Sequence, residues 1–255
     1  MENKKPIVSL QNVIKSFGDR KILDDVSLDI FSGETLVIIG RSGVGKSTIL
    51  RHMAGLTAPE KGKVLVKDRD LGSLSEEELN ELRKTMGVVF QYAALFDSLT
   101  VFENVAFRLT RDFEMDETKA REVVAKKLEL VGLKNDLMDL KPSQLSGGMR
   151  KRVGLARALA VDPEIILYDE PTSGLDPVSS EAINDLVLEM QKKLQVTSVV
   201  VTHDMRSAYK VADRIAMIYD GKIIGLGTPD EIRGSQDPVI HQFVTGSVEG
   251  PIPTR

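Results

Sequence analysis

A glycine-rich segment, GRSGVGKST at residues 40 to 48, carries the most specific chemistry in the sequence. It matches the pattern G-x-x-x-x-G-K-[ST] from Gly40 to Ser47, with an apolar strand before it and a helical pattern after it. Glycines let the main chain turn N–H groups toward phosphate oxygens, and the helix N-terminus adds a partial positive charge. Lys46 supplies a charge for the outer phosphates, and the Ser47 hydroxyl can bind Mg²⁺. The segment predicts a nucleoside triphosphate site, and it leaves GTPases, small-molecule kinases, RecA-like motors and transporter ATPases open.

A second segment, EIILYDEP at residues 164 to 171, is an apolar strand that ends in two carboxylates. Asp169 at the strand tip suits a Mg²⁺ ligand. Glu170 follows it, and Pro171 is expected to hold Glu170 in an extended conformation. A carboxylate beside the metal can align or deprotonate the attacking water. The alternative is an exposed acidic turn, and the phosphate loop in the same chain favours the functional interpretation.

A third segment, LSGGMRKRVGLARALA at residues 145 to 160, predicts a helix with Ser146 as its N-cap. Two glycines in the first turn leave the N–H groups open to an anion. The alternative is an ordinary helix start with a basic exposed face formed by Arg150, Lys151 and Arg152. The order of the three segments decides between the two interpretations.

In that order, the motifs resemble the ATP-binding cassette (ABC) family over about residues 7 to 235. The resemblance rests on GRSGVGKS, Gln91 after the strand MGVVF, LSGG at 145 to 148, ILYDE at 166 to 170, SGLD at 173 to 176 and His203 in VVVTHD. It implies an α/β fold: a P-loop NTPase core with an antiparallel β layer and an inserted helical subdomain.

The resemblance also implies a role for each matched residue, with ATP and Mg²⁺ as cofactors. Phe17 would stack on the adenine, Gln91 would touch Mg²⁺ and the attacking water, and His203 would contact the γ-phosphate. The expected nucleotide-binding residues are Phe17, Gly40, Arg41, Ser42, Gly43, Val44, Gly45, Lys46, Ser47, Thr48, Ser146, Gly147, Gly148 and Asp176. The expected metal ligands are Ser47, Gln91 and Asp169, and the expected catalytic residues are Glu170, His203 and Gln91.

The active unit implied by the resemblance is a dimer with two ATP molecules between its subunits. Ser146 and Gly148 would bind the ATP of the opposite subunit, and Asp176 would help to join the two subunits. Met149 stands where glutamine usually follows LSGG. Because methionine cannot donate amide hydrogen bonds, a contact from this position to nucleotide is in doubt.

Plainer interpretations of two of these residues stay open. Phe17 could be a core aromatic of a hairpin, and Gln91 could be a solvated strand end. No second histidine or cysteine lies at ligand spacing from His203, which disfavours a zinc site. The other two histidines, His52 and His241, are expected at the surface.

The elements that must position these residues alternate between strands and helices. Residues 7 to 14, 21 to 30 and 62 to 67 predict an antiparallel layer, with a hairpin turn at Gly18-Asp19. Unbroken apolar runs predict core strands at residues 36 to 39, 86 to 90, 164 to 168, 197 to 201 and 214 to 218. Capping signals predict helix starts at Ser75, Asp116 and Thr228, with a stop at Gly132. The expected organisation is a nucleotide-binding domain at 7 to 235, a helical subdomain inserted at about 92 to 160, and a C-terminal extension at 236 to 255.

Composition excludes several classes of protein. The chain has 255 residues, 42% apolar and 28% charged, which is typical of globular proteins. A net charge of -4 disfavours nucleic acid as a partner, and the absence of cysteine excludes disulfides. The longest apolar runs have four or five residues, so we expect no membrane span.

A cassette of this kind must act on other protein chains, because it has no membrane segment of its own to move a substrate. The resemblance to the family implies that residues 92 to 107, YAALFDSLTVFENVAF, form a groove for a helix of a membrane subunit, although part of this segment is expected to be subdomain core. The chain resembles the Mla-type branch, the ATPases of phospholipid transporters that contain MCE proteins. This resemblance rests on the segments FQYAALFDSLTVFENVAF, LSGGMRKRVGLARA and YDEPTSGLDP and on the C-terminal GPIP. This implies a second copy of the chain, transmembrane permease subunits, an MCE protein, a small STAS-domain protein and a peripheral location on the cytoplasmic face of a bacterial inner membrane. Pro251 and Pro253 stiffen the extension, and we expect it to dock on a neighbouring subunit rather than to be a frayed tail.

There are three alternative functions to phospholipid transport: two of another functional class, and one with another transported substrate. A soluble ABC ATPase that acts on DNA or ribosomes would need tandem cassettes, a coiled-coil insert or a basic face, and none is evident. An adapter that binds ATP without hydrolysing it would be expected to lack Glu170 or His203, and both are present. An importer or exporter of another substrate stays open, because the substrate contacts lie in other chains.

Overall fold

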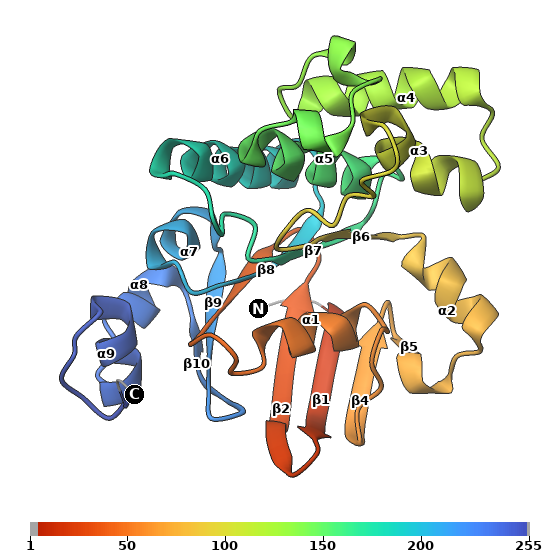
Figure 1. Cartoon of the computed structure of the whole chain (residues 1–255). Helices are drawn as coiled ribbons and strands as arrows, with labels where there is room; N and C mark the ends of the chain where they lie inside the picture. The colour runs from red at the N-terminus through yellow and green to blue at the C-terminus, as the bar shows by residue number, and fades with distance from the viewer. Residues whose placement is uncertain (1–4, 254–255) are drawn as a thin grey trace. The chain divides into compact units, whose positions relative to one another are not determined.

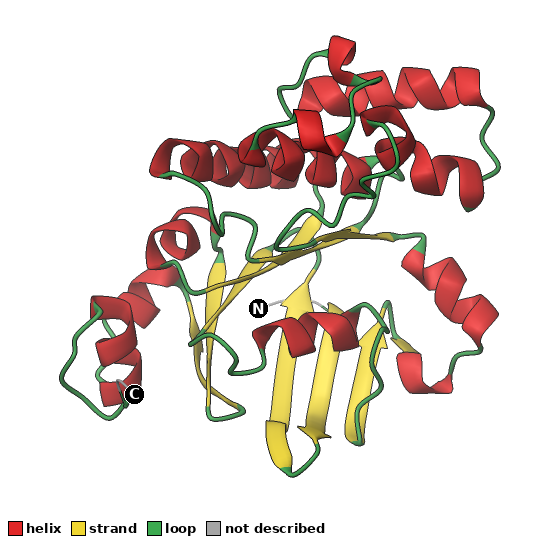
Figure 2. Ribbon diagram, viewed as in Figure 1, coloured by secondary structure: helices red, strands yellow, loops and turns green. Residues whose placement is uncertain are grey.

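The computed structural model describes residues 5–253, and they divide into two compact units (Figures 1 and 2). The first unit comprises the described residues of 1–79 and 197–255, and the second comprises Asn80–Val196. The helical subdomain predicted at about 92 to 160 falls within the range of the second unit. Its status as a separate domain stays a prediction.

An antiparallel sheet in the first unit contains β1 (Pro6–Phe17), β2 (Arg20–Phe31), β4 (Lys61–Val66) and β5 (Arg69–Asp70) in the order β2-β1-β4-β5. The three predicted strands and their hairpin are confirmed. Phe17 pairs with Arg20 across the turn, where Gly18 has a φ of 58°. In β2 the buried side chains of Val26, Leu28 and Ile30 alternate with the exposed Ser27 and Asp29, so this strand turns one face to the core.

Four strands of the first unit belong to the sheet that carries the phosphate loop. They are β3 (Thr35–Ile39), β8 (Thr197–Thr202), β9 (Arg214–Tyr219) and β10 (Lys222–Gly227), in the order β10-β9-β3-β8. β3 is parallel to both neighbours and every one of its residues is buried, as the unbroken apolar runs predict. β10 was not predicted, because its sequence KIIGLG contains two glycines and is only half-buried.

Short helices complete the first unit, and one of them, α8, starts at the predicted cap Thr228. They are α1 (Lys46–Met53), α7 (Met205–Val211), α8 (Pro229–Arg233), α9 (Pro238–Thr245) and the 3-10 turn η1 (Leu71–Ser73). Thr228 and Glu231 form a capping box at the start of α8. Ser75 does the same with Glu78 for α2 (Glu76–Arg83), since each backbone N–H of the pair donates to the other side chain.

The second unit combines a parallel strand pair with packed helices (Figure 2). The strands are β6 (Met86–Val89) and β7 (Ile165–Asp169), and the helices are α3 (Val101–Arg111), α4 (Glu117–Leu130), α5 (Gly147–Leu159) and α6 (Pro177–Leu194), with 3-10 turns η2 (Asn135–Leu137) and η3 (Pro142–Gln144). Asp116 caps α4 as predicted, and Gly132 follows its end with a φ of 70°. Helices α3, α4 and α5 pack on one another through buried residues such as Val105, Leu128 and Leu155.

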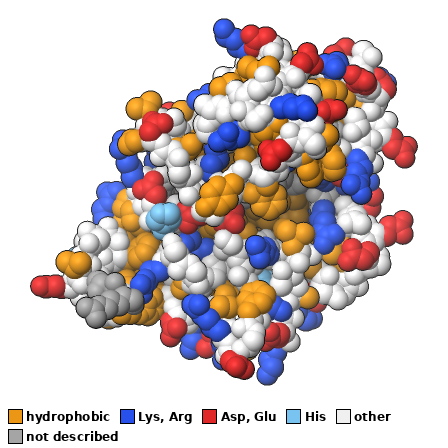
Figure 3. All heavy atoms as spheres, in the orientation of Figure 1, with side chains coloured by type: hydrophobic (Ala, Val, Ile, Leu, Met, Phe, Trp, Pro, Cys, Tyr) orange, Lys and Arg blue, Asp and Glu red, His pale blue; other side chains and the backbone are white. Residues whose placement is uncertain are grey.

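Within residues 5–253, no helix is long and apolar enough to cross a membrane. Acidic and basic side chains are interspersed on the face shown in Figure 3.

Candidate active site

The phosphate loop connects β3 to α1 in the first unit, and its conformation requires glycine. Gly40 has a φ of 154°, and a Cβ atom there would lie 2.5 Å from the carbonyl oxygen of Ile218. Gly45, the N-cap of α1, has a φ of 118°. Both φ values lie in the region that side chains rarely adopt, so the two glycines set the path of the loop.

The side chains of the loop differ in exposure. Lys46 is 5% exposed and its Nζ donates hydrogen bonds to the carbonyl oxygens of Gly40 at 2.8 Å and Arg41 at 3.1 Å. Ser42 is exposed, whereas Val44, Ser47 and Thr48 are half-buried. Because the first turn of α1 has no acidic residue, the positive end of the helix is not neutralised there.

Two further predicted residues of the first unit are exposed. Phe17, at the end of β1, is 52% exposed, so its interpretation as a core aromatic is wrong. The Nζ atom of Lys15 lies 5.6 Å from the centroid of its ring. His203 is exposed directly after the buried strand β8, and Asp204 begins α7 behind it as an N-cap. The exposed ring of Phe17 is available for stacking.

The two carboxylates of the second unit have different environments. Asp169 ends β7 and is half-buried. Glu170 is 7% exposed, so the alternative of an exposed acidic turn is wrong. Its φ is 46°, which also corrects the prediction of an extended residue: the N–H of Ser173 donates to the carbonyl oxygen of Glu170 at 3.1 Å, and the chain turns here. A left-handed non-glycine residue is costly, and such strain is concentrated at functional sites.

Gln91 is held by contacts at both its side chain and its main chain. Its Nε2 donates to the Oγ of Ser173 at 3.3 Å, and its carbonyl oxygen accepts a hydrogen bond from Lys151. The residue is half-buried and its side chain is hydrogen-bonded, which disfavours the interpretation as a solvated strand end. The bond to Ser173 links Gln91 to the turn that follows Glu170.

The signature segment begins a helix, as the sequence predicts. The Oγ of Ser146 accepts a hydrogen bond from the N–H of Met149 at 3.3 Å, which makes Ser146 the N-cap of α5. Ser146 and Gly147 are exposed, and Gly148 is half-buried. Asp176 caps α6 in the same way, and a hydrogen bond from the Ser179 hydroxyl lowers the pKa of its carboxyl. Both helix starts therefore present polar groups at the surface.

Two other side chains differ from their predicted environment. Lys151 is 6% exposed, so the basic face predicted for residues 150 to 152 is not wholly exposed. Burial lowers the pKa of Lys151, against the opposing charges of Glu170 and Asp169. His52, expected at the surface, is fully buried, and its Nδ1 lies 2.7 Å from the carbonyl oxygen of Thr48. Burial lowers the pKa of His52 as well.

Comparison with known proteins decides the family. The model of the family described as "ABC transporter" matches residues 23–173. The chain belongs to the ABC transporter family. The cassette is 44% identical to protein TRIGALACTOSYLDIACYLGLYCEROL 3, chloroplastic, of Arabidopsis thaliana, over 99% of this chain and 77% of that protein. It is 40% identical to the intermembrane phospholipid transport system ATP-binding protein MlaF of Haemophilus influenzae, over 96% of this chain and 93% of that protein.

A solved structure supports the same assignment. A dimeric ATP-binding cassette in a post-hydrolysis state, bound to ADP and Pi, shares the fold with a TM-score of 0.80 and 36% identity, over 87% of this chain and 98% of that chain. The predicted fold class, a P-loop NTPase core with an antiparallel β layer, is therefore confirmed, and the chain is an ATPase of the ABC type.

The residues predicted to bind Mg²⁺ fit that ion by their chemistry. Ser47 offers a hydroxyl, Asp169 a carboxylate and Gln91 an amide carbonyl, and Mg²⁺ prefers oxygen ligands of this kind. Gln91 uses its amide nitrogen for the bond to Ser173, which is consistent with its carbonyl oxygen serving a cation. Within residues 5–253 the cassette has no group of three or more His, Cys, Asp or Glu side chains that could hold a metal. Mg²⁺ sites with few protein ligands are commonly completed by water and substrate phosphates.

Sequence reasoning missed three basic residues of the cassette that contact its functional segments. Arg20 donates to the carbonyl oxygen of Gly43 in the phosphate loop at 3.5 Å. Lys151 and Arg157, both on α5, donate to the loop that begins at Gln91. Helical spacing was an available signal for Lys151, because it lies four residues before the buried Leu155.

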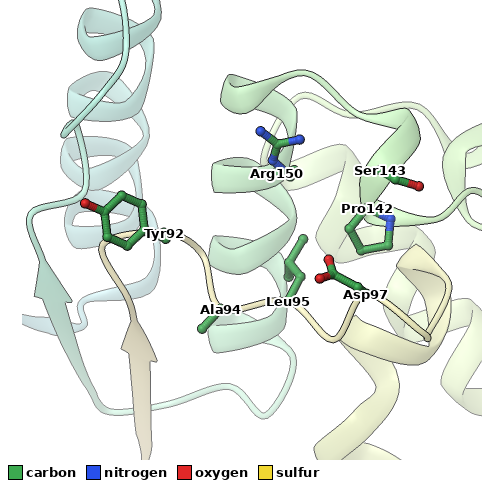
Figure 4. Close-up of a pocket in the computed structure, with 7 residues that line it drawn as sticks. All are labelled: Tyr92, Ala94, Leu95, Asp97, Pro142, Ser143 and Arg150. Carbon is green, nitrogen blue, oxygen red and sulfur yellow. The ribbon is translucent and has the colours of Figure 1, made fainter.

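A shallow pocket of about 240 Å³ lies in the second unit of the cassette. Figure 4 shows its lining residues, which come from the loop after β6, from the turn η3 and from the start of α5. They are Tyr92, Ala94, Leu95, Asp97, Pro142, Ser143 and Arg150. The predicted groove segment, residues 92 to 107, thus divides in two: its first part lines this pocket, whereas Val101 and Val105 are buried in α3.

Proposed function

We propose that this ATPase drives a transporter that moves phospholipids between membranes. The observation that carries the proposal is the similarity, over 96% of this chain, to a protein named as the ATP-binding component of an intermembrane phospholipid transport system. Similarity over nearly the whole length of both chains is stronger support than a shared phosphate loop, because that loop occurs in many unrelated activities.

The proposed reaction is hydrolysis of Mg²⁺-ATP, with one role for each predicted residue. Phe17 stacks on the adenine, and the main chain of residues 40 to 48 with Lys46 holds the phosphates. Glu170 aligns the attacking water, and His203 contacts the γ-phosphate. Mg²⁺, held by Ser47, Asp169 and Gln91, would neutralise charge that develops on the phosphates. The buried state of Lys46 and Glu170 supports these roles, since charge interactions are stronger where water is excluded.

We also propose that two copies of the chain close around two ATP molecules. The exposed start of α5 at Ser146, Gly147 and Gly148 suits an anion supplied by another subunit. Asp176 at the start of α6 is exposed and can contact that subunit. ATP would favour the closed dimer, and hydrolysis would reopen it. Met149 contacts Ser146 through its backbone N–H, so this contact does not depend on the Met149 side chain.

The pocket in the second unit is the proposed docking site for a transmembrane permease. Tyr92 beside it is 81% exposed, and Leu95 and Arg150 add apolar and charged groups. Aromatic residues and arginines are enriched in interface hot spots. An MCE protein and a small STAS-domain protein would complete the assembly on the cytoplasmic face of a bacterial inner membrane.

The C-terminal extension is proposed to contact a neighbouring subunit through the part that its own chain leaves exposed. The Gln242 side chain bonds to the N–H of Ile252 at 2.6 Å and to its carbonyl oxygen at 3.2 Å, which fixes the end of the segment on α9. Val248, between these anchors, is 79% exposed. Deletion of residues 246 to 255 should weaken assembly of the complex, and assembly without any loss would contradict this role.

Affinity purification of the tagged full chain from detergent-solubilised membranes tests the proposed function. Mass spectrometry should find an MCE protein and a permease with the wild-type chain. A permease for another substrate, an importer or exporter, would reject the phospholipid proposal and leave the ATPase roles intact. Ribosomal or DNA-repair partners without a permease would reject the transport function. Reconstituted lipid transfer is the next measurement if an MCE protein is found.

A further inference from the structure

The buried ammonium group of Lys151 connects the main chains of two residues that have proposed roles in hydrolysis. Lys151 lies one turn into α5 and is 6% exposed. Its Nζ donates a hydrogen bond to the carbonyl oxygen of Gln91 and lies 3.4 Å from the carbonyl oxygen of Glu170. A single cation thus bridges the loop after β6 and the turn after β7.

The same helix fixes the loop beyond Gln91. Arg157 donates hydrogen bonds to the carbonyl oxygens of Ala93 at 2.6 Å and Ala94 at 2.7 Å. These two alanines have φ values of 61° and 45°, in the left-handed region, and such residues persist only where their surroundings hold them. Gly154 allows the close approach, since a Cβ atom there would lie 3.1 Å from the Cβ of Ala93.

The contacts come from one side of α5. Lys151, Gly154 and Arg157 are spaced three residues apart, so they lie along the same side of the helix. The loop from 91 to 94 is therefore held by two cations and one close backbone contact. Lys151 differs from Arg157 because it also reaches the carbonyl oxygen of Glu170.

We propose that Lys151 is a positioning residue for ATP hydrolysis, which holds the main chains of Gln91 and Glu170 in a fixed relation. The inference rests on the proposed roles of Gln91 and Glu170, because Lys151 acts through them and is not itself assigned a contact with nucleotide. Both acceptors are carbonyl oxygens of the functional residues themselves, so a shift of either main chain displaces a side chain that serves the attacking water or Mg²⁺. A displacement of about 1 Å can lower a rate 100-fold without loss of substrate binding.

Substitution of Lys151 by methionine tests the proposal, because methionine has nearly the same length and no donor. In the full chain, assayed in the complex that co-purifies with it, K151M should lower kcat about 10- to 100-fold, with KM and Kd for ATP within about twofold of wild type. K151Q keeps a donor on a shorter side chain and should give an intermediate kcat. If K151M does not fold, K151Q decides: a kcat equal to that of wild type would overturn the proposal.

The matched control is Lys127 on α4, which is also a buried lysine, at 9% exposed, but is paired with Asp162. K127M should lower the thermal midpoint of unfolding and leave kcat per folded protein unchanged. An equal loss of kcat in K127M and K151M would assign Lys151 a merely structural role. A higher KM with unchanged kcat would also overturn the proposal.

A double-mutant cycle separates failure of this inference from failure of the proposed function. If Lys151 acts through Glu170, K151M should cost much less in kcat when Glu170 is already glutamine. Additive losses in the double variant would reject the inference while the role of Glu170 stands. Normal turnover by E170Q alone would instead reject the proposed role of Glu170, on which the inference rests.

Discussion

The side chain of Lys46 lies 2.8 Å from the carbonyl oxygen of Gly40, so the last charged residue of the phosphate loop contacts the first glycine of the same loop. The contact closes the loop on itself. It keeps the buried ammonium within the turn that the glycines create, where phosphate oxygens would lie on the proposed function. The ammonium group of Lys46 is thus held by the loop itself.

Substitution of Lys46 by alanine should lower ATP hydrolysis about 100-fold or more, because a charge aimed at the phosphates is removed without a replacement. Phosphate release by the purified complex measures the effect. The control is K21A, which removes an exposed lysine whose Nζ pairs with Asp24 at 3.0 Å and which should hydrolyse ATP at the wild-type rate. Retained hydrolysis in K46A would contradict the role of Lys46.

Substitution of Glu170 by glutamine should lower kcat by about 100- to 10,000-fold, because the amide cannot accept the proton of the attacking water. ATP binding should persist, and size-exclusion chromatography with Mg²⁺-ATP should show a trapped dimer. E164Q, which changes an exposed carboxylate just before β7, should behave as wild type. An E170Q protein that stays monomeric with ATP bound would count against ATP-driven closure.

Local sequence patterns were sufficient to predict the phosphate loop and the predicted helix starts. The glycines of the loop are required by φ values that other residues rarely adopt, and the capping boxes at Ser75 and Thr228 satisfy backbone N–H groups within three residues. Such features depend on neighbours in the chain alone. The core strand β3 was predictable for a related reason, because only a strand buried on both faces tolerates the run LVII.

The features that the sequence could not predict depend on distant contacts. Pro171 disfavours a helical conformation at Glu170, but it does not choose between an extended and a left-handed φ. Lys151 is charged, and only its packing against the loop after β6 makes it a buried residue. His52 lies three residues after the buried Ile49 on α1, so its burial was detectable from helical spacing, whereas its residue type favoured the surface.

Substitution of Tyr92 by alanine should weaken the association with the proposed permease about tenfold or more, because an exposed aromatic at the edge of a pocket is typical of a hot spot. Quantitative mass spectrometry after affinity purification measures the recovered permease. F113A is the matched control, since Phe113 is an exposed aromatic of the same unit, at 44%, and does not line the pocket. Equal recovery with Y92A and wild type would remove the pocket from the docking proposal.

The buried His52 should make the free energy of unfolding depend on pH. Burial lowers the pKa of His52 in the folded chain below the usual histidine value of 6.5, so protons bind more readily to the unfolded chain. The stabilising contribution is therefore fully present above that value and is lost as the pH falls through the lowered pKa. Urea unfolding at pH 7.5 and at about pH 5.5 should show a smaller decrease in stability for H52Q than for wild type, since the glutamine amide can donate to the Thr48 carbonyl oxygen and does not titrate. H241Q, which changes an exposed histidine, should keep the wild-type decrease, and the same decrease in H52Q would show that another group is responsible.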